Sequence, residues 1–178
     1  MDSTPTNDVL LRKVAEDDLA ILFEQQQDPA ASWMAAFTAK DPTDWPAFAA
    51  KWAKILGDET VTARAIVCGG RVVGNVGAFV APWSGQREVT YWIGREHWGR
   101  GLATRGLTAL VGLLAERPLH ARAAADNTAS LRVLEKCGFI PTGSERAFAE
   151  ARGEEIEEVI LQLSAGAPNR ASQQAARA

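Results

Sequence analysis

The fold of this chain is decided by residues 88–104, E-V-T-Y-W-I-G-R-E-H-W-G-R-G-L-A-T. This stretch predicts an apolar strand over residues 89–93, a turn that contains Gly99 and Gly101, and then an amphipathic helix. Glycines let the main chain approach a ligand closely, and the N–H groups at the positive end of a helix dipole favour anions. We therefore expect a site for a phosphate-bearing ligand.

Length and composition are typical of one globular domain. The 178 residues suffice for one domain with its own core but not for two. A hydrophobic content of 47% with 23% charged residues argues against a disordered chain. The net charge of −3 excludes the broad basic surface of a nucleic-acid-binding protein. Any anion site is therefore local, and Arg95, Arg100 and Arg105 place positive charge around the glycine turn.

No export signal, membrane segment or metal-binding pattern is evident. The start, M-D-S-T-P-T-N-D, lacks the basic and apolar regions of a secretory signal. No apolar run approaches the roughly 20 residues that cross a bilayer. Cys68 and Cys137 form no C-x-x-C pair and have no His at metal spacing, so we expect neither a disulfide framework nor a metal site. The expected location is the cytoplasm.

A short strand, helices and then three successive antiparallel strands are predicted to precede the glycine turn. Hydrophobic periodicity predicts a strand over residues 9–13 and a helix over residues 15–27. Two short helices follow, the second starting at Asp44 as N-cap. The aromatic residues from Trp33 to Trp52 are expected to divide between core and acceptor pocket. Gly69-Gly70 then joins strands over residues 60–68 and 72–80 in a hairpin, and a further strand covers residues 87–94.

The chain after the turn predicts a crossover and a closing hairpin. The helix after Gly101 ends before Pro118, and a strand over residues 119–125 then lies parallel to the strand before the turn. Asn127 caps a second helix, which Gly138 ends. Residues 139–148 and 155–163 form the hairpin. We expect one domain over residues 1–163 and a mobile tail over residues 164–178.

A dinucleotide-binding fold shares the glycine loop. G-R-G-L-A-T resembles the start of a G-x-G-x-x-G fingerprint, and Asp126 follows the next strand. Thr104 replaces the third glycine, however, and the loop follows antiparallel strands rather than opening a βαβ series. The order of elements therefore disfavours a nicotinamide-dependent reductase, which is kept as an alternative.

Two motifs at this separation carry a specific family resemblance. W-G-R-G-L-A-T at residues 98–104 and A-D-N-T-A-S-L-R-V-L-E-K-C-G-F at residues 125–139 resemble the GNAT superfamily of acyl-CoA-dependent N-acetyltransferases, over about residues 9–163. Within it, the chain is most similar to the branch of ribosomal-protein N-terminal acetyltransferases. The resemblance implies an α/β (α+β) fold with a mixed, mostly antiparallel sheet of about seven strands, split near its middle, and helices on both faces.

The resemblance also implies the reaction and its partners. The expected activity is transfer of an acetyl group from acetyl-CoA to a primary amine by direct attack, the amine being a protein N-terminus or a small molecule. No nucleic-acid or membrane partner is expected, and a homodimer is left open. A non-catalytic acyl-CoA sensor is the main alternative.

The implied cofactor contacts gather around both motifs. The pyrophosphate loop falls on residues 98–104, with Trp98 in place of the usual Gln or Arg. Backbone groups of Trp92 and Ile93 would face the pantetheine arm, with Asn127 on its other side. Arg132 and Lys136 would face the adenosine phosphates, although a basic pair at this spacing is more often solvent-exposed. The predicted cofactor contacts are Trp92, Ile93, Trp98, Gly99, Arg100, Gly101, Leu102, Ala103, Thr104, Asn127, Arg132 and Lys136.

The implied catalytic groups are fewer. Leu134 occupies the helix position where many family members carry a tyrosine acid, so a tyrosine-based mechanism is excluded for this chain. Ser130 is the substitute acid, and it is equally a common residue for a first helical turn. Glu88 is the candidate base, acting through water, or else a charge at a strand edge. The Ile93 amide is the expected oxyanion donor.

Overall fold

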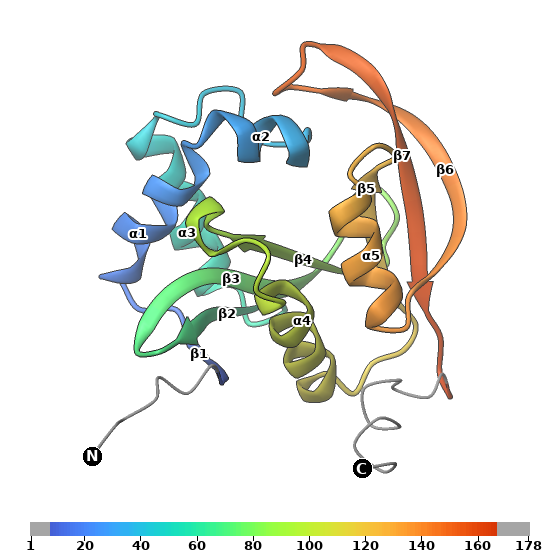
Figure 1. The fold of residues 1–178 in the computed structure, drawn as a ribbon, viewed down its shortest axis with the longest axis horizontal. Coiled ribbons are helices and arrows are strands. Elements are labelled where there is room, and N and C mark those ends of the chain that lie inside the picture. Colours follow the sequence, from blue (N-terminus) through green and yellow to red (C-terminus); the bar gives the residue numbers. More distant parts are fainter. Residues whose placement is uncertain (1–7, 167–178) are drawn as a thin grey trace.

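The computed structural model describes residues 8–166, and within them seven strands form one sheet with helices on both faces (Figure 1). Residues 167–178, most of the expected tail, lie outside the described part. No helix within residues 8–166 is long and apolar enough to cross a membrane. The elements in chain order are β1 (Val9–Lys13), α1 (Asp18–Gln26), α2 (Pro29–Ala35), α3 (Trp45–Gly57), β2 (Thr62–Cys68), β3 (Arg71–Val80), β4 (Arg87–Ile93), the 3-10 helix η1 (Arg95–His97), α4 (Leu102–Leu113), β5 (Leu119–Ala124), α5 (Thr128–Lys136), β6 (Ile140–Ala149) and β7 (Glu154–Leu163).

The sheet is split between its fourth and fifth strands. Its order is β1-β2-β3-β4-β5-β7-β6, and every neighbouring pair except β4 and β5 is antiparallel. β4 and β5 are parallel and share one register pair, Glu88 with His120. By contrast, β4 pairs with β3 along its whole length, as far as Ile93 opposite Gly74. The predicted seven-stranded, mostly antiparallel, centrally split sheet is therefore confirmed, and a doubly wound parallel sheet is not formed.

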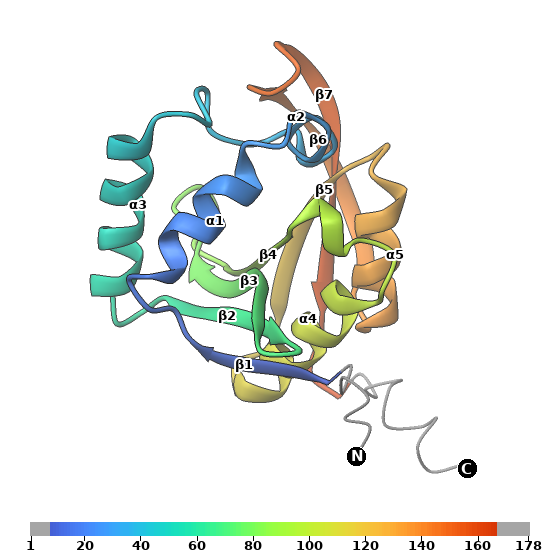
Figure 2. The same ribbon diagram turned by 60° about the vertical axis from the view of Figure 1, so that its left-hand side comes forward.

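The two larger cores lie on opposite faces of the sheet. Ala65 and Ile66 are neighbours on β2 and are both fully buried, because successive side chains of a strand point to opposite faces. Ile66 packs with side chains of α4 and α5, whereas Ala65 packs with side chains of α1 and α3. Figure 2 shows α1 and α3 on one side of the sheet and α4 and α5 on the other. The helix side chains in these cores include Leu107, Leu110 and Leu134 on the first face and Leu22, Phe48 and Trp52 on the second.

Side-chain caps start two helices where the sequence predicts. The Asp44 carboxylate accepts a hydrogen bond from the Ala47 N–H at 2.9 Å at the start of α3. The Asn127 carbonyl oxygen Oδ1 accepts one from the Ser130 N–H at 3.1 Å at the start of α5. Each cap satisfies a first-turn donor that has no partner within the helix.

α1 begins later than predicted, at Asp18 rather than near residue 15. The Asp18 carboxylate accepts the Ala15 N–H at 2.7 Å and pairs with the Arg12 guanidinium of β1 at 2.6 Å. These contacts hold the preceding residues in a turn and delay the helix. The hydrogen bonds from Arg12 also keep the pKa of Asp18 below its usual range.

Candidate active site

The split in the sheet opens into a cavity of about 550 Å³. Its walls are the C-terminal half of β4, the turn before α4, the first turn of α4, one side of α5, and α2. The lining residues are Ala31, Met34, Ala35, Tyr91, Trp92, Ile93, His97, Trp98, Gly99, Gly101, Leu102, Ala103, Thr104, Asn127, Ala129, Ser130, Arg132, Val133 and Lys136. The two sequence motifs, separated by a helix and a strand, therefore face each other across one space.

The glycine turn leaves the start of α4 open to a ligand. Gly99 and Gly101 have φ angles of +74° and +68°, which favour glycine, and a Cβ at either position meets no atom within 4 Å. Gly101 is the N-cap of α4 and supplies no capping side chain. The first helical bond here runs from the Arg105 N–H to the Gly101 carbonyl at 3.1 Å. The amides of Leu102, Ala103 and Thr104 thus face the cavity at the positive end of the helix.

Basic side chains flank this turn unequally. Arg132 and Lys136, one turn apart on α5, both line the cavity and are exposed. Arg100, one of the predicted cofactor contacts, lies outside the lining, with its guanidinium 3.5 Å from His97 Nδ1 and 3.9 Å from Cys68 Sγ. It is the one predicted cofactor contact that does not line the cavity.

β4 offers open backbone groups at the split. The Gly94 N–H donates to the Val73 carbonyl of β3 at 2.9 Å. Backbone groups alternate sides along a strand, so the N–H and carbonyl of Ile93 point away from β3, toward the gap. The Trp98 indole N–H donates to that carbonyl at 2.9 Å, which leaves the N–H as the open backbone group of Ile93 at the gap.

Trp92 contributes differently from the prediction. Its register partner is Asn75, and the same alternation directs its backbone groups toward β3 rather than into the gap. Its indole nitrogen Nε1 is buried and has no hydrogen-bond partner within the described residues. Trp92 therefore lines the cavity with its side chain, whereas the open backbone groups belong to Tyr91 and Ile93.

Asn127 connects two walls of the cavity. Its Oδ1 caps α5 at Ser130, and its Nδ2 donates to the Met34 carbonyl of α2 at 3.1 Å. The β6–β7 turn also holds α2, because Arg152 in this turn donates to the Trp33 carbonyl of α2 at 2.9 Å. Arg152 also pairs with Asp126 at 2.6 Å. α2 is thereby held across the end of the cavity.

Tyr91 is a site residue that the sequence reasoning missed. Its hydroxyl lies 2.6 Å from Ser130 Oγ and 3.2 Å from the Ser130 carbonyl oxygen. Burial raises the pKa of Tyr91 to about 12, against the lowering effect of the Ser130 hydrogen bond. Leu134 is buried in the core. The position of Leu134 on α5 therefore supplies no tyrosine acid. The only tyrosine of the chain, Tyr91, instead reaches the cavity from β4.

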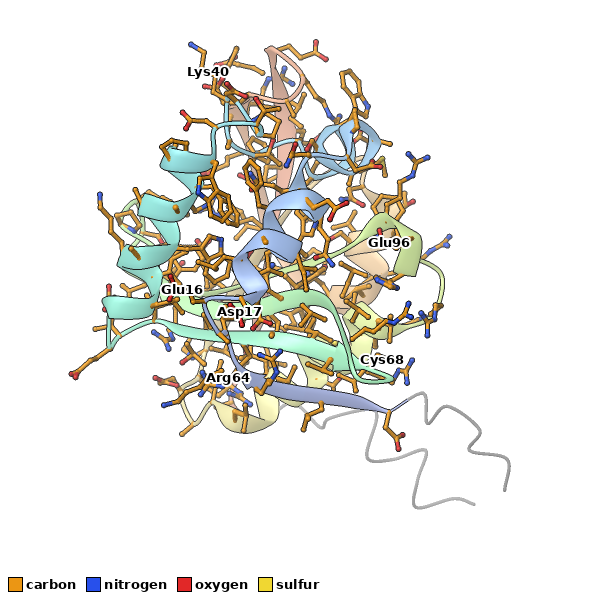
Figure 3. All side chains as sticks on the ribbon, turned by 90° about the vertical axis from the view of Figure 1, so that its left-hand side faces the viewer. Glu16, Asp17, Lys40, Arg64, Cys68 and Glu96 are labelled. Atoms are coloured by element: carbon orange, nitrogen blue, oxygen red, sulfur yellow. The ribbon has the colours of Figure 1, made fainter. Side chains whose placement is uncertain are left out.

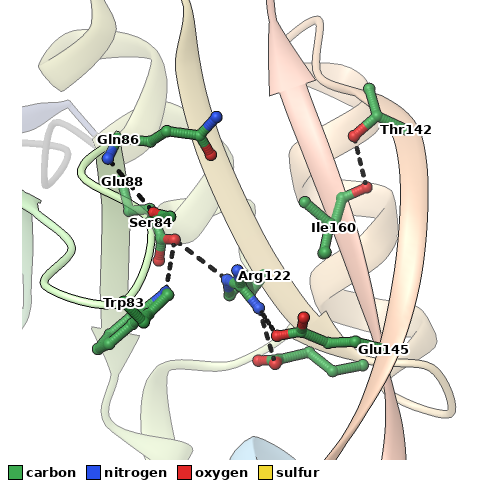
Figure 4. A network of polar contacts seen from close by, with 9 residues as sticks. Trp83, Ser84, Gln86, Glu88, Arg122, Thr142, Glu145 and Ile160 are labelled. Atoms are coloured by element: carbon green, nitrogen blue, oxygen red, sulfur yellow. Dashed lines mark hydrogen bonds and ion pairs between the residues drawn. The ribbon is translucent and has the colours of Figure 1, made fainter.

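Glu88 lies outside the cavity lining, on the other face of β4 from Tyr91, and is buried. Its Oε1 accepts hydrogen bonds from Arg122 Nε at 3.0 Å and from the Trp83 indole at 3.1 Å (Figure 4). Arg122 also pairs with Glu145 and Glu158. Burial raises the pKa of Glu158, and Arg122 opposes that rise. Neither of these bonds engages the second Glu88 oxygen, Oε2.

Cysteine and metal chemistry find no support in the described residues. Cys137 is buried in the main core, 3.5 Å from Thr108 Oγ1, and burial raises the pKa of its thiol. A thiol in these surroundings is a poor nucleophile. No group of three or more His, Cys, Asp and Glu side chains within residues 8–166 is arranged to hold a metal ion.

Comparison with known proteins gives one family and one fold. The profile of the Acetyltransferase (GNAT) domain matches residues 8–140. An uncharacterised N-acetyltransferase, p20, from Bacillus licheniformis is 24% identical over 174 residues, which span 92% of this chain and 96% of that protein.

Two solved structures share the fold at low sequence identity. RimJ of Mycobacterium smegmatis, in complex with a CoA disulfide, aligns with a TM-score of 0.75 at 19% identity over 97% of this chain and 91% of that one. Spermidine N-acetyltransferase of Vibrio cholerae, in complex with CoA and spermine, aligns with a TM-score of 0.75 at 15% identity over 89% of this chain and 96% of that one.

Proposed function

The chain belongs to the acetyltransferase (GNAT) family, and from this premise we propose that it transfers the acetyl group of acetyl-CoA to a primary amine at the β4–β5 cavity. One observation carries the assignment of the site. On one side of the cavity lies the start of α4, which has no capping side chain and follows two glycines with positive φ. On another side lies β4, whose backbone is open toward β5. A diphosphate suits the first feature and an amide-bearing arm suits the second.

Acetyl-CoA fits the polar groups along this cavity. The pyrophosphate would lie on the amides of residues 102–104, and Arg132 and Lys136 would neutralise the outer phosphates. The pantetheine arm would add to the open side of β4 as an extra strand, beside Asn127. Trp98 stabilises this edge by holding the Ile93 carbonyl, which leaves the Ile93 N–H to polarise the thioester carbonyl.

The catalytic roles follow from the two faces of β4. Ser130 lies in the cavity and would donate a hydrogen bond to the leaving sulfur. Glu88 lies on the opposite face, where Oε2 would accept the amine proton through a water molecule while Arg122 holds Oε1. The amine would thus approach from the face covered by α1 and α2. A buried Trp92 indole N–H without a partner on that face is a further donor for the acceptor.

The acceptor is proposed to be a protein N-terminus or a small polyamine. The Vibrio cholerae relative is a spermidine N-acetyltransferase, and its fold likeness makes polyamines one class to test. The carboxylates of Glu88, Glu145 and Glu158 surround a single guanidinium, an excess of negative charge that suits a cationic amine. Both cysteines are buried and free, which agrees with a reducing compartment such as the cytoplasm.

The test is release of CoA thiol from acetyl-CoA across a panel of amines that includes spermidine and peptides with free N-termini. The proposal expects thiol release that depends on the amine, and a melting temperature that rises with acetyl-CoA. Stabilisation without thiol release for any amine would favour an acyl-CoA sensor. Stabilisation by NADPH instead of acetyl-CoA would contradict the proposal altogether.

A further inference from the structure

Tyr91 and Ser130 form a direct contact between two walls of the cavity. Tyr91 stands on β4, and its ring packs against the main core. Ser130 stands in the first turn of α5, 39 residues later in the chain. The two hydroxyl oxygens are 2.6 Å apart, a short distance for an O–H···O bond. The second contact, from the tyrosine hydroxyl to the Ser130 carbonyl, is 3.2 Å long.

The hydrogens of this pair can be arranged in two ways. If Tyr91 donates to the Ser130 carbonyl, the serine hydroxyl donates to Tyr91 and its hydrogen is unavailable to a ligand. If Tyr91 donates to Ser130 Oγ, the serine hydrogen is released and can point into the cavity. Rotation of two O–H bonds exchanges the arrangements, and no heavy atom has to move.

We propose that Tyr91 is the positioning residue for Ser130 in acetyl transfer, an inference that rests on the proposed function. By donating to Oγ, the tyrosine hydroxyl turns the serine hydrogen toward the sulfur of acetyl-CoA. The amine nitrogen forms its bond to the thioester carbonyl carbon, the carbon–sulfur bond breaks, and the electron pair stays on sulfur. The Ser130 hydroxyl stabilises that charge. The amine proton passes through water to Glu88 and the sulfur takes up a proton from the solvent, so that an amide and a thiol result.

The surroundings of Tyr91 suit a hydrogen-bond donor that keeps its proton. Burial raises its pKa to about 12, so the phenol is neutral at physiological pH and always has a hydrogen to donate. Its oxygen contacts Ser130, and its effect reaches the leaving group only through that residue. Tyr91 is therefore distinct from a tyrosine that would itself protonate sulfur, and Leu134 occupies the position of such a residue.

The experiment compares Tyr91→Phe, Ser130→Ala and the double variant by kcat and by the KM for acetyl-CoA. Tyr91→Phe keeps the packed ring and loses only the hydroxyl. We expect kcat to fall about tenfold with the KM for acetyl-CoA unchanged, since one hydrogen bond to a developing charge is lost. In the Ser130→Ala background, Tyr91→Phe is expected to cause no further loss, because the residue that it positions is gone.

Thr108→Val is the matched control, because Thr108 Oγ1 contacts Cys137 at 3.5 Å in the same core but lies outside the cavity lining. It is expected to keep the wild-type kcat. An unchanged kcat in Tyr91→Phe, losses that multiply in the double variant, or an equal loss in Thr108→Val would each overturn the inference. If the wild-type protein itself releases no thiol, the proposed function fails first, and the role of Tyr91 fails with it.

Discussion

Replacing Gly101 by Glu is expected to abolish acetyl-CoA binding without unfolding the protein. Gly101 has a φ angle of +68°, and a residue with a side chain is strained there by roughly 1–2 kcal/mol. A carboxylate at the N-terminus of α4 recovers about 0.3–1 kcal/mol from the helix dipole. The added Cβ meets no atom within 4 Å, so the side chain enters open space beside the first-turn amides. The variant should therefore fold and place its own anion where the pyrophosphate would bind.

The expected size of the effect follows from mass action. At a hundredfold excess over its dissociation constant, acetyl-CoA should stabilise the wild-type protein by about 2.7 kcal/mol. For a domain of this length, each kcal/mol raises the melting temperature by roughly 2–4 °C, which gives a shift of about 5–11 °C. Thermal denaturation with increasing acetyl-CoA should show this shift for the wild-type protein and none for Gly101→Glu.

Gly85→Glu is the matched control. Gly85 also has a φ angle of +68° and open space around its Cβ position, but it lies in the β3–β4 turn, outside the cavity lining. Both substitutions therefore carry the same backbone strain and the same change of charge. Gly85→Glu should keep the full ligand-induced shift. Equal shifts for the two variants would refute the placement of the anion site at α4.

Two further predictions concern stability, each with a paired control. Gly74→Ala should lower the free energy of unfolding, measured by urea denaturation, by about 2–3 kcal/mol, because its Cβ would lie 2.0 Å from the Trp92 carbonyl oxygen. Gly143→Ala is the control, because its Cβ would have no atom within 4 Å. Its free energy of unfolding should stay within about 0.5 kcal/mol of the wild-type value. Similar losses for both would contradict this explanation. Asp18→Asn should cost about 1.5–3 kcal/mol at pH 7 through the charged hydrogen bonds to Arg12, and the exposed Asp17→Asn (Figure 3) should cost little. The folded-state pKa of Asp18 is lowered, so the stabilisation by its charged hydrogen bonds is present above the unfolded pKa of about 4. This stabilisation disappears as the pH falls through the folded-state pKa. A stability difference between Asp18→Asn and Asp17→Asn that persists in strong acid would therefore contradict the prediction.

Local chemistry explains why much of the fold was predictable. Asn127 and Asp44 cap their helices with their own side chains, and Gly69 and Gly70 both have positive φ in the β2–β3 hairpin. Such signals act within a few residues and are visible in the sequence. The delayed start of α1 is different, because Asp18 is held by Arg12 from the preceding strand.

Contacts between distant segments explain what was not predictable. Alternation along β4 places Tyr91 on the face of Val89 and Ile93, and this signal was present in the sequence. This face of β4 meets Ser130 because of the way α5 packs after the crossover. No local sequence pattern encodes that packing. Glu88 likewise acquires Arg122 from β5, 34 residues away, and so lies in a buried network rather than at a strand edge.

The uneven pairing of β5 has a consequence expected for the order in which the site folds. β5 shares one register pair with β4 but six with β7, and the α5 helix that carries Ser130 follows directly from it. We therefore expect β5 and α5 to be weakly held during synthesis until residues 154–163 have left the ribosome. Until then the free edge of β5 would be open to chaperones, proteases and other unpaired strands. A nascent chain that stops short of β7 would already contain the glycine turn and Tyr91. The helix α5, which lies opposite both across the cavity, would not yet be held in place.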